Sequence, residues 1–257
     1  MNPFSSAEMA EGYARSRPPV HPRIIERIGL ERVSCALDLG CGAGISTRAL
    51  EDVADTCIGI DPAEPMMRWA RLTAPFAQFA VGMAEAIPLA DQSVDLITAA
   101  GSLNYADLDR FFGEAARVLR SSGALAVYDF SPGRVVDEWF YEFECRYPWP
   151  RNEARVLNPE TLVREASGFQ LHSKEEFAIA LPLTRRFCVD YVLTETNVAD
   201  AVRGGVPLES IRSWCEATLH DFWPDDSAVR EVLFRGYWVC LTRQGSPVIS
   251  RRGILAS

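Results

Sequence analysis

The chain has 257 residues, of which 48% are hydrophobic and 24% are charged, and it carries a net charge of −9 at pH 7. This length suffices for one well-buried α/β domain with an added cap, and the acidic balance with a single lysine argues against a nucleic-acid substrate. Since the chain has no apolar run long enough to cross a membrane and residues 1–17 have no apolar core, we expect a cytoplasmic protein without membrane span or signal peptide.

The N-terminal segment, residues 1–32, precedes the first apolar strand and is expected to form lid helices. Tyr13 and Arg17 lead into Pro18 and Pro19, and a second helical stretch follows over about residues 23–30. His21 lies directly before Pro22 in this segment, where a structural or solvated role is expected.

A glycine-rich loop follows the first predicted strand, residues 33–39. Glycine stands at every second position, at Gly40, Gly42 and Gly44, before helix-compatible residues resume at Ile45. Such glycines permit positive φ and let a ligand approach the backbone N–H groups where a helix begins. A dinucleotide fingerprint would need glycine at position 45, so this spacing weakens a nicotinamide or flavin interpretation. The Asp-x-Gly-x-Gly-x-Gly pattern that begins at Asp38 instead resembles motif I of class I S-adenosylmethionine (SAM) dependent methyltransferases.

The second predicted strand, residues 56–60, ends at Asp61, directly before Pro62. A carboxylate at this place can accept hydrogen bonds from both hydroxyls of a ribose, and the family that the loop resembles has an acid here. The alternative is that Asp61 caps the helix that starts near Pro62.

The third and fourth strands are predicted over residues 79–81 and 96–100. Many members of the resembled family carry Asp where this chain has Met83, which leaves adenine contacts to Glu85 or to the backbone of Met83 and Ala84. A helix over about 107–120 and a fifth strand over 124–130 complete the match, so the resemblance covers about residues 33–130.

The resemblance also extends to the N-terminal segment, which is similar to that of small-molecule methyltransferases of the trans-aconitate and ubiquinone-pathway type. In such relatives this helix folds over the cofactor, so Tyr13 or Arg17 would reach the methionine carboxylate; alternatively, Tyr13 only packs. The set of cofactor-binding residues that the resemblance implies is Tyr13, Arg17, Asp38, Gly40, Cys41, Gly42, Asp61, Pro62, Met66, Met83, Ala84, Glu85, Ala99 and Ala100.

The resemblance implies a Rossmann-like, doubly wound α/β fold with a mostly parallel seven-stranded sheet whose last strand is antiparallel. Helical, aromatic-rich cap insertions are predicted at 131–168 and 180–235, because six aromatic residues fall between Trp139 and Trp149 and substrate choice resides in divergent segments. We expect closing strands at 169–179 and 236–243 and a tail at 244–257. The seven cysteines have no Cys-x-x-Cys spacing and are expected to be reduced thiols.

Four residues are candidates for orienting or deprotonating a methyl acceptor. Asn104 and Tyr105 follow the fourth strand, Glu142 lies in the predicted cap, and His220 lies among aromatic residues, where it would otherwise simply pack. No His, Cys and acid cluster has metal-ligand spacing, so we predict no metal.

The sequence thus predicts a SAM-dependent methyltransferase of secondary metabolism that acts on O or N of a small apolar or aromatic molecule and yields S-adenosylhomocysteine. The alternatives are a SAM-binding protein diverted to rearrangement or cyclisation and a non-catalytic binding protein of the same fold. We expect a small-molecule substrate as the partner, without nucleic acid or membrane, and a monomer or homodimer.

Overall fold

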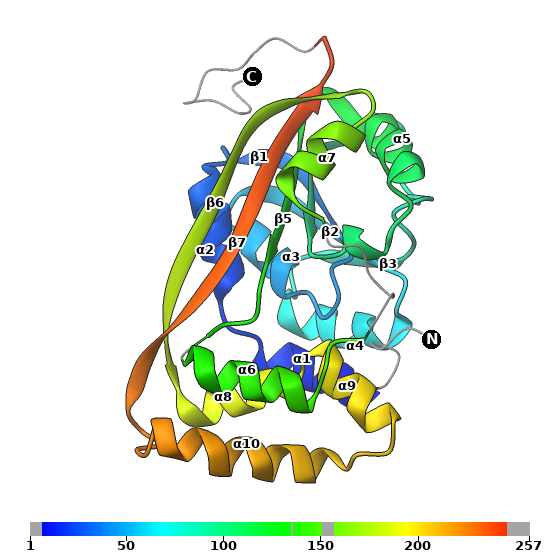
Figure 1. Cartoon of the computed structure of the whole chain (residues 1–257). Coiled ribbons are helices and arrows are strands. Elements are labelled where there is room, and N and C mark those ends of the chain that lie inside the picture. The colour runs from blue at the N-terminus through cyan, green and yellow to red at the C-terminus, as the bar shows by residue number, and fades with distance from the viewer. Residues whose placement is uncertain (1–6, 135, 151–156, 246–257) are drawn as a thin grey trace.

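The computed structural model describes residues 7–134, 136–150 and 157–245. One sheet runs through the molecule, flanked by helices on both faces (Figure 1). Its strands are β1 (Val33–Leu39), β2 (Ala54–Asp61), β3 (Gln78–Val81), β4 (Val94–Ala100), β5 (Leu119–Phe130), β6 (Phe169–Thr184) and β7 (Val229–Arg243).

The strand order is β3-β2-β1-β4-β5-β7-β6. The pairs from β3 to β5 are parallel, whereas β7 lies antiparallel to both β5 and β6. The predicted fold class, a mostly parallel seven-stranded sheet that closes with an antiparallel last strand, is therefore confirmed. The order reverses between β1 and β4, and ligands of open α/β sheets bind outside the carboxyl ends of strands at such a point.

Two apolar layers cover the two faces of the sheet. The residues of β5 alternate between these layers. Ala124, Ala126 and Tyr128 belong to one buried cluster, while Leu125 and Val127 belong to the other, as the two-residue period of a strand requires. The first layer includes helices α2 (Val20–Ile28) and α3 (Ile45–Leu50), and the second includes α5 (Leu108–Val118) and α7 (Pro159–Glu165). Helices α1 (Ala7–Ser16) and α4 (Glu64–Thr73) lie together at the carboxyl end of the sheet.

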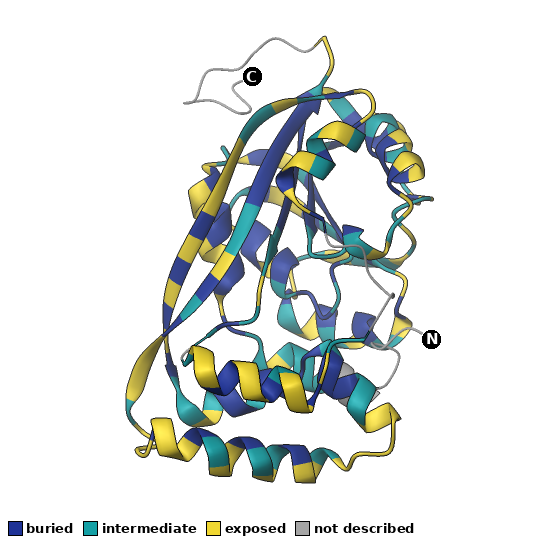
Figure 2. Cartoon of the chain, in the orientation of Figure 1, coloured by how far each residue is buried: buried dark blue, intermediate teal, exposed yellow. Residues whose placement is uncertain are grey.

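A helical cap lies beyond this end of the sheet. It comprises α6 (Asp137–Arg146), α8 (Arg185–Val192), α9 (Thr196–Arg203) and α10 (Leu208–Phe222), which form the lower part of Figure 1. A two-stranded ribbon joins them to the sheet, because β6 and β7 remain paired to Thr184 and Val229, well past the point where β5 ends at Phe130 opposite Gly236. Buried and exposed residues alternate along this part of β6 (Figure 2).

The cap has its own aromatic core. The Trp139 ring stacks on Phe143 at 5.5 Å between centroids and on Trp214 of α10 at 6.1 Å, and its indole nitrogen donates to Thr218. Of the six aromatic residues predicted to wall a cap, Trp139, Phe140, Phe143 and Tyr147 are buried in this way.

Two predicted boundaries differ from the structure. The closing strands are longer than the predicted 169–179 and 236–243, because the ribbon continues into the segment assigned to a cap. Helix α7, predicted as cap, packs on the sheet instead, where Leu162 lies in one cluster with Phe112 and Phe169. The predicted tail lies outside the described residues from position 246 onward.

None of the helices in the described part of the chain is both long and apolar enough to span a membrane. All seven cysteines are free thiols, as expected from their spacing, and five of them are buried.

Candidate functional site

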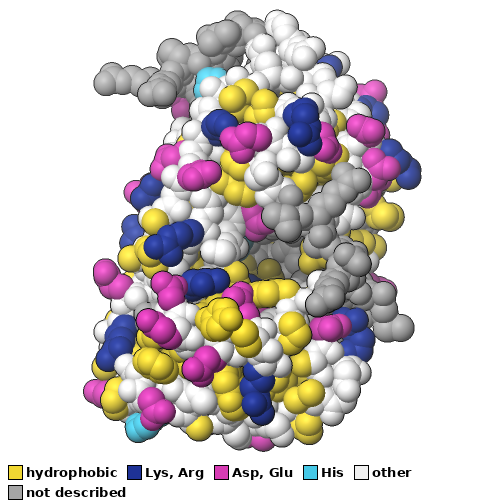
Figure 3. All heavy atoms as spheres, viewed as in Figure 1, with side chains coloured by type: hydrophobic (Ala, Val, Ile, Leu, Met, Phe, Trp, Pro, Cys, Tyr) yellow, Lys and Arg dark blue, Asp and Glu magenta, His cyan; other side chains and the backbone are white. Residues whose placement is uncertain are grey.

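A cavity of about 660 Å³ lies where the carboxyl ends of β1, β2, β4 and β5 face the lid and the cap. Figure 3 shows the surface hollowed between the upper and lower parts of the molecule. This volume is within the range of small-molecule sites. Three parts of the chain contribute walls: the sheet with its loops, the N-terminal helices and the cap segment at Glu195 and Thr196.

The glycine loop after β1 forms one wall. Gly40, Gly42 and Gly44 all have positive φ, but a side chain added at each of them would contact different neighbours. A Cβ on Gly40 would lie 2.2 Å from the Ser102 side chain, and one on Gly44 would lie 2.9 Å from the Ala70 backbone. A Cβ on Gly42 would meet only Tyr13, at 3.9 Å, and would project into the cavity. Gly42 is therefore the position where the missing side chain leaves space for a ligand.

The backbone N–H groups of this loop have protein partners. The N–H groups of Gly40 and Cys41 donate to the Ile60 carbonyl at 2.8 and 3.1 Å, and that of Gly44 donates to Cys41 at 2.8 Å. The Gly42 N–H donates to Asp61 Oδ2 at 2.9 Å. These four N–H groups are therefore used within the protein, and the loop offers a smooth surface for the close approach of a ligand.

Asp61, at the end of β2, joins the loop to the next helix. Its Oδ2 accepts from Gly42 and its Oδ1 accepts from the Ala63 N–H at 2.8 Å, so each oxygen keeps lone-pair capacity for a further donor. The carboxyl is largely buried at the cavity wall, and burial raises its pKa while these backbone donors lower it. The alternative that Asp61 caps the next helix is wrong, because α4 begins at Glu64 with Ala63 as its N-cap and no side-chain cap. Asp61 instead holds the turn after β2 and lines the cavity.

Asp38 does not line the cavity, which corrects its assignment as a contact residue. Its fully buried carboxylate accepts hydrogen bonds from Ser46 and Thr47, each at 2.7 Å, and from Thr98 at 3.1 Å. Burial raises its pKa to about 6 against the effect of these three donors. Asp38 therefore ties β1 to α3 and β4 and positions the loop from behind. Cys41 and Ala99 are also buried away from the cavity, because Cys41 packs beneath the turn against Gly59 and Ala99 packs in the sheet core.

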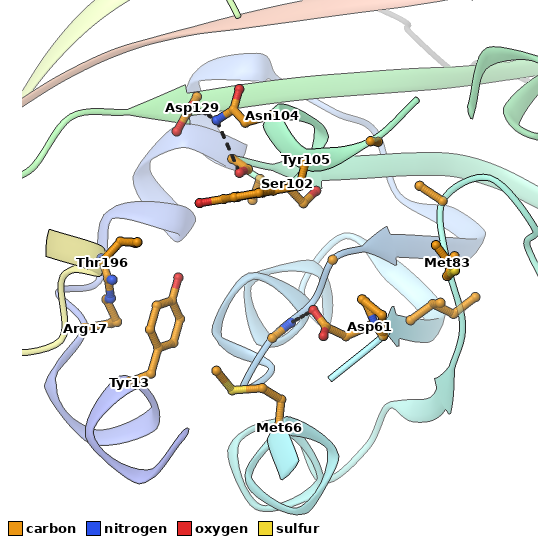
Figure 4. Close-up of a pocket in the computed structure, with 18 of the residues that line it drawn as sticks. Tyr13, Arg17, Asp61, Met66, Met83, Ser102, Asn104, Tyr105, Asp129 and Thr196 are labelled. Atoms are coloured by element: carbon orange, nitrogen blue, oxygen red, sulfur yellow. Dashed lines mark hydrogen bonds between the residues drawn. The ribbon is translucent and has the colours of Figure 1, made fainter. Parts of the chain in front are cut away.

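The other predicted cofactor residues do line the cavity. Figure 4 shows Asp61 and Met83 on one side, Met66 below, and Tyr13 and Arg17 on the opposite side. The Glu85 carboxylate, considered for an adenine contact, accepts from the Asp107 N–H at 2.8 Å and so also caps α5. The lining members of the predicted set are Tyr13, Arg17, Gly40, Gly42, Asp61, Pro62, Met66, Met83, Ala84, Glu85 and Ala100.

Arg17 links the lid to the cap at the cavity wall. Its guanidinium donates to Glu195 Oε1 at 2.9 Å and to the Thr194 carbonyl at 3.2 Å, and it lies 4.1 Å from the centre of the Tyr13 ring. Its Nε is buried and has no hydrogen-bond partner among the described residues.

The four predicted acceptor-orienting residues separate into two pairs. Asn104 and Tyr105 line the cavity, in and beside the short 3₁₀ helix η2 (Leu103–Tyr105). Glu142 and His220 are exposed on the cap helices and do not line it. His220 contacts Arg185 at 2.6 Å instead. The structure therefore does not support Glu142 and His220 as acceptor residues. Of the aromatic neighbours of His220, Trp223 is buried in the protein core and Phe222 is exposed.

His21 is buried and hydrogen-bonded within the protein, which agrees with the structural role among the two expected, but it also lines the cavity. It is buried on α2, its Nδ1 lies 2.9 Å from the Tyr128 hydroxyl, and burial together with Arg17 lowers its pKa to about 4. It is therefore neutral at physiological pH.

The sequence interpretation also missed Ser102, Asp129, Phe130, Glu195 and Thr196, all of which line the cavity, whereas Trp149, which also lines it, belongs to the predicted aromatic cap. A signal was present for Asp129, because it ends a predicted strand just as Asp61 does. Glu195 and Thr196 lie far along the chain, and only the folded cap brings them to the site. Within the described residues, no group of three or more His, Cys, Asp or Glu side chains is arranged to hold a metal.

Comparison with known proteins identifies the region around the loop. Residues 37–127 match the family model described as a methyltransferase domain. An uncharacterized methyltransferase of Mycobacterium tuberculosis is 37% identical over 125 residues, which are 48% of this chain and 50% of that protein. The phthiotriol/phenolphthiotriol dimycocerosates methyltransferase of Mycobacterium leprae is 34% identical over 60% of this chain and 56% of its own length. The chain thus spans about half the length of the curated relatives that it matches.

The fold continues beyond the matched region. A provisionally assigned type II methyltransferase from Anaeromyxobacter dehalogenans superposes with a TM-score of 0.69 at 24% identity, over 89% of this chain and 97% of that one. At this identity the similarity concerns the fold, and it extends across the cap.

Proposed function

We propose that this chain, whose residues 37–127 belong to the methyltransferase domain family, transfers the methyl group of SAM to an oxygen or nitrogen atom of a small apolar or aromatic molecule. The product of the cofactor would be S-adenosylhomocysteine. A cytoplasmic location, a role in secondary metabolism and a monomeric or dimeric state stay predictions from the sequence.

The pairing of Gly42 with Asp61 on one cavity wall is the observation that carries this proposal. Asp61 is held by two backbone N–H groups and keeps one acceptor position on each oxygen for the two ribose hydroxyls. Gly42 presents no side chain beside it, so the adenosine portion has room. Arg17 lines the cavity across from Asp61, and its positive charge favours the methionine carboxylate there. These residues fit SAM at both of its polar ends.

SAM supplies an electrophilic methyl group on a positively charged sulfur, so the protein need only align the acceptor and exclude water. The lid and the cap would do the latter. Arg17 of the N-terminal segment donates to Glu195 of the cap, and Figure 4 shows Tyr13, Arg17 and Thr196 together on one side of the cavity. Asn104 and Tyr105 lie on the sheet side, where an acceptor would be positioned against them.

The alternative function, in which a SAM-binding protein guides a rearrangement or cyclisation, would need aromatic side chains of the cap to line the cavity. Among the six aromatic residues of that segment, only Trp149 lines the cavity, while four form the buried core of the cap and Tyr141 is exposed. The geometry therefore gives this alternative no specific support.

Calorimetric titration with SAM and, separately, with NADH tests the cofactor. We expect micromolar binding of SAM and no binding of NADH, followed by formation of S-adenosylhomocysteine when acceptors are added. Tight SAM binding without turnover over a broad panel of amines, phenols and acids would favour the non-catalytic or diverted alternatives. Failure to bind SAM would contradict the proposal.

A further inference from the structure

Asp129 lies at the carboxyl end of β5, on the part of the cavity wall above the cofactor residues in Figure 4. Its Oδ2 accepts from the Asn104 side-chain amide at 2.9 Å, and its Oδ1 accepts from the Phe130 N–H at 2.8 Å. Asn104 donates also toward the Gly101 carbonyl at 3.4 Å, which fixes the amide between the two. The carboxyl is therefore held in a defined orientation at the cavity.

The charges around Asp129 leave it without a recorded cationic partner in the described part of the chain. Both of its hydrogen-bond donors are neutral. Arg17 is already paired with Glu195 at 2.9 Å, and His21 is neutral because burial lowers its pKa to about 4. On the adjacent strand, the pKa of Tyr237 is raised by burial and by Asp129 itself. Burial, with a smaller contribution from Glu195, raises the pKa of Asp129, as expected for a carboxylate that lacks a counter-charge.

We propose that the methyl acceptor is an amine and that Asp129 is the residue that binds its nitrogen through an N–H donor. This inference rests on the methyl-transfer function proposed above. A buried carboxylate is costly unless a cation pairs with it, and an ammonium group supplies that cation together with hydrogen-bond donors. Phe130 and Pro132, which follow Asp129 in the chain, line the same cavity, as does Trp149, and they offer an apolar surface for the body of the amine.

The reaction balances with Asp129 as a proton carrier. The bound ammonium gives one proton to the carboxylate, which passes it to solvent, and the neutral nitrogen is left with a lone pair. The C–N bond then forms from this lone pair while the C–S bond breaks and its electrons stay on sulfur. The products are a methylated ammonium, S-adenosylhomocysteine and one released proton. The raised pKa of Asp129 helps this step, because it makes proton transfer from the ammonium to the carboxylate less unfavourable. The gain matters most for an amine whose ammonium form has a pKa far above that of an ordinary carboxyl.

The test compares two probes of nearly the same shape on the full chain saturated with S-adenosylhomocysteine. Titration calorimetry with 2-phenylethylamine and with 2-phenylethanol should show the amine binding at least about tenfold more tightly, because charged hydrogen bonds contribute more than neutral ones. In Asp129→Asn the preference should fall to within about threefold, while the affinity for SAM stays within about threefold of wild type. Asp221→Asn, an exposed aspartate of α10, is the matched control and should keep the full preference.

Equal affinities of the two probes for the wild-type chain would overturn the proposal, and this comparison needs no variant to fold. An amine preference that survives in a folded Asp129→Asn variant would also overturn it. Failure of the methyltransferase function itself is read separately, because it appears as a loss of SAM binding to the wild-type chain before any amine is added.

Discussion

Gly42 is the glycine of the loop whose substitution would report on ligand binding. A valine there would place its side chain in the cavity, 3.9 Å from Tyr13, whereas substitutions at Gly40 and Gly44 would collide with the protein itself. We expect Gly42→Val to weaken SAM binding at least about tenfold, measured by calorimetry, because the side chain occupies the space for the adenosine portion.

The substitution has a second effect, because a valine at a position with positive φ strains the backbone. Gly29 provides the control for this strain. Gly29 follows α2 with φ of 68°, comparable to 51° at Gly42, and a Cβ there meets nothing within 4 Å. Gly29→Val should therefore lose stability through the same backbone strain and leave SAM affinity unchanged. If both variants weakened binding equally, the cavity assignment of Gly42 would be wrong.

Asp38 predicts a pH dependence of stability. Its pKa is raised to about 6 from an ordinary 3.8, so between these values the folded state keeps a proton that the unfolded state has released. Stability contributed by this residue is thus fully present at low pH and is lost as the pH rises through about 6. An asparagine in its place cannot ionise, so the stability of Asp38→Asn relative to wild type should increase from about pH 4.5 to about pH 7, as urea denaturation at each pH would show. A constant difference across this interval would contradict the assignment.

At the scale of single residues, more of the predicted cofactor-binding residues than of the predicted acceptor residues line the cavity. Gly42 and Asp61 were recognisable because a loop and a strand end fix their surroundings locally. His220 was chosen for its aromatic neighbours, but Trp223 is buried beneath the cap and His220 points to solvent and Arg185. Burial of a histidine depends on which face of a helix meets the rest of the molecule. Periodicity alone does not reveal this where the cap is apolar on several sides.

Among the elements, the contact between lid and cap depends on one buried ion pair. The side chains of Arg17 and Glu195 are 12% and 7% exposed, so removal of the arginine would leave a buried carboxylate unpaired. Such a loss costs about 3–5 kcal/mol, which corresponds to roughly a hundredfold or greater increase in local opening. We expect Arg17→Met to raise amide hydrogen exchange in α1 by at least about a hundredfold, with a smaller effect in β1 and β4, whose opening requires global unfolding.

Arg15 serves as the matched control for this experiment. It belongs to α1, which ends at Ser16 just before Arg17, and it pairs with Glu11, but the two side chains are 67% and 47% exposed. Exposed pairs contribute about 0–1 kcal/mol, so Arg15→Met should change exchange in α1 by less than about fivefold. Similar effects of the two substitutions would show that the Arg17–Glu195 pair does not hold the lid in place.

The elements of the sheet were predictable because each parallel strand is a short apolar run followed by a recognisable turn and helix. The outer ribbon was not, because residues 177–183 are all apolar and do not alternate with polar residues, and beyond Phe130 and Gly236 the strands β6 and β7 pair only with each other. Helix α7 was assigned to the cap since it follows the aromatic segment. Its contacts with Phe112 and Phe169 arise only once β6 has paired with β7.

In the whole molecule, the cavity is composite. The sheet supplies Asp61, Asn104 and Asp129, the N-terminal segment supplies Arg17, and the cap supplies Glu195. The family match covers residues 37–127, so it includes Asp61 and Asn104 but not Arg17, Asp129 or Glu195. Sequence similarity therefore covers only part of the cavity, and the remaining walls come from segments outside the match.

This composite arrangement predicts how SAM should stabilise the protein. A ligand present at about 100 times its Kd adds about 2.7 kcal/mol to the stability of the folded state, which for a chain of this size raises Tm by roughly 5 to 11 °C. Because the cavity joins three parts of the chain, protection from hydrogen exchange should increase in α1 and around Glu195 as well as in the loop at Gly42. NADH at the same concentration should change neither Tm nor exchange. Protection confined to the loop and β2 would mean that SAM binds to the sheet without engaging lid and cap, and the proposed exclusion of water by these elements would then be wrong.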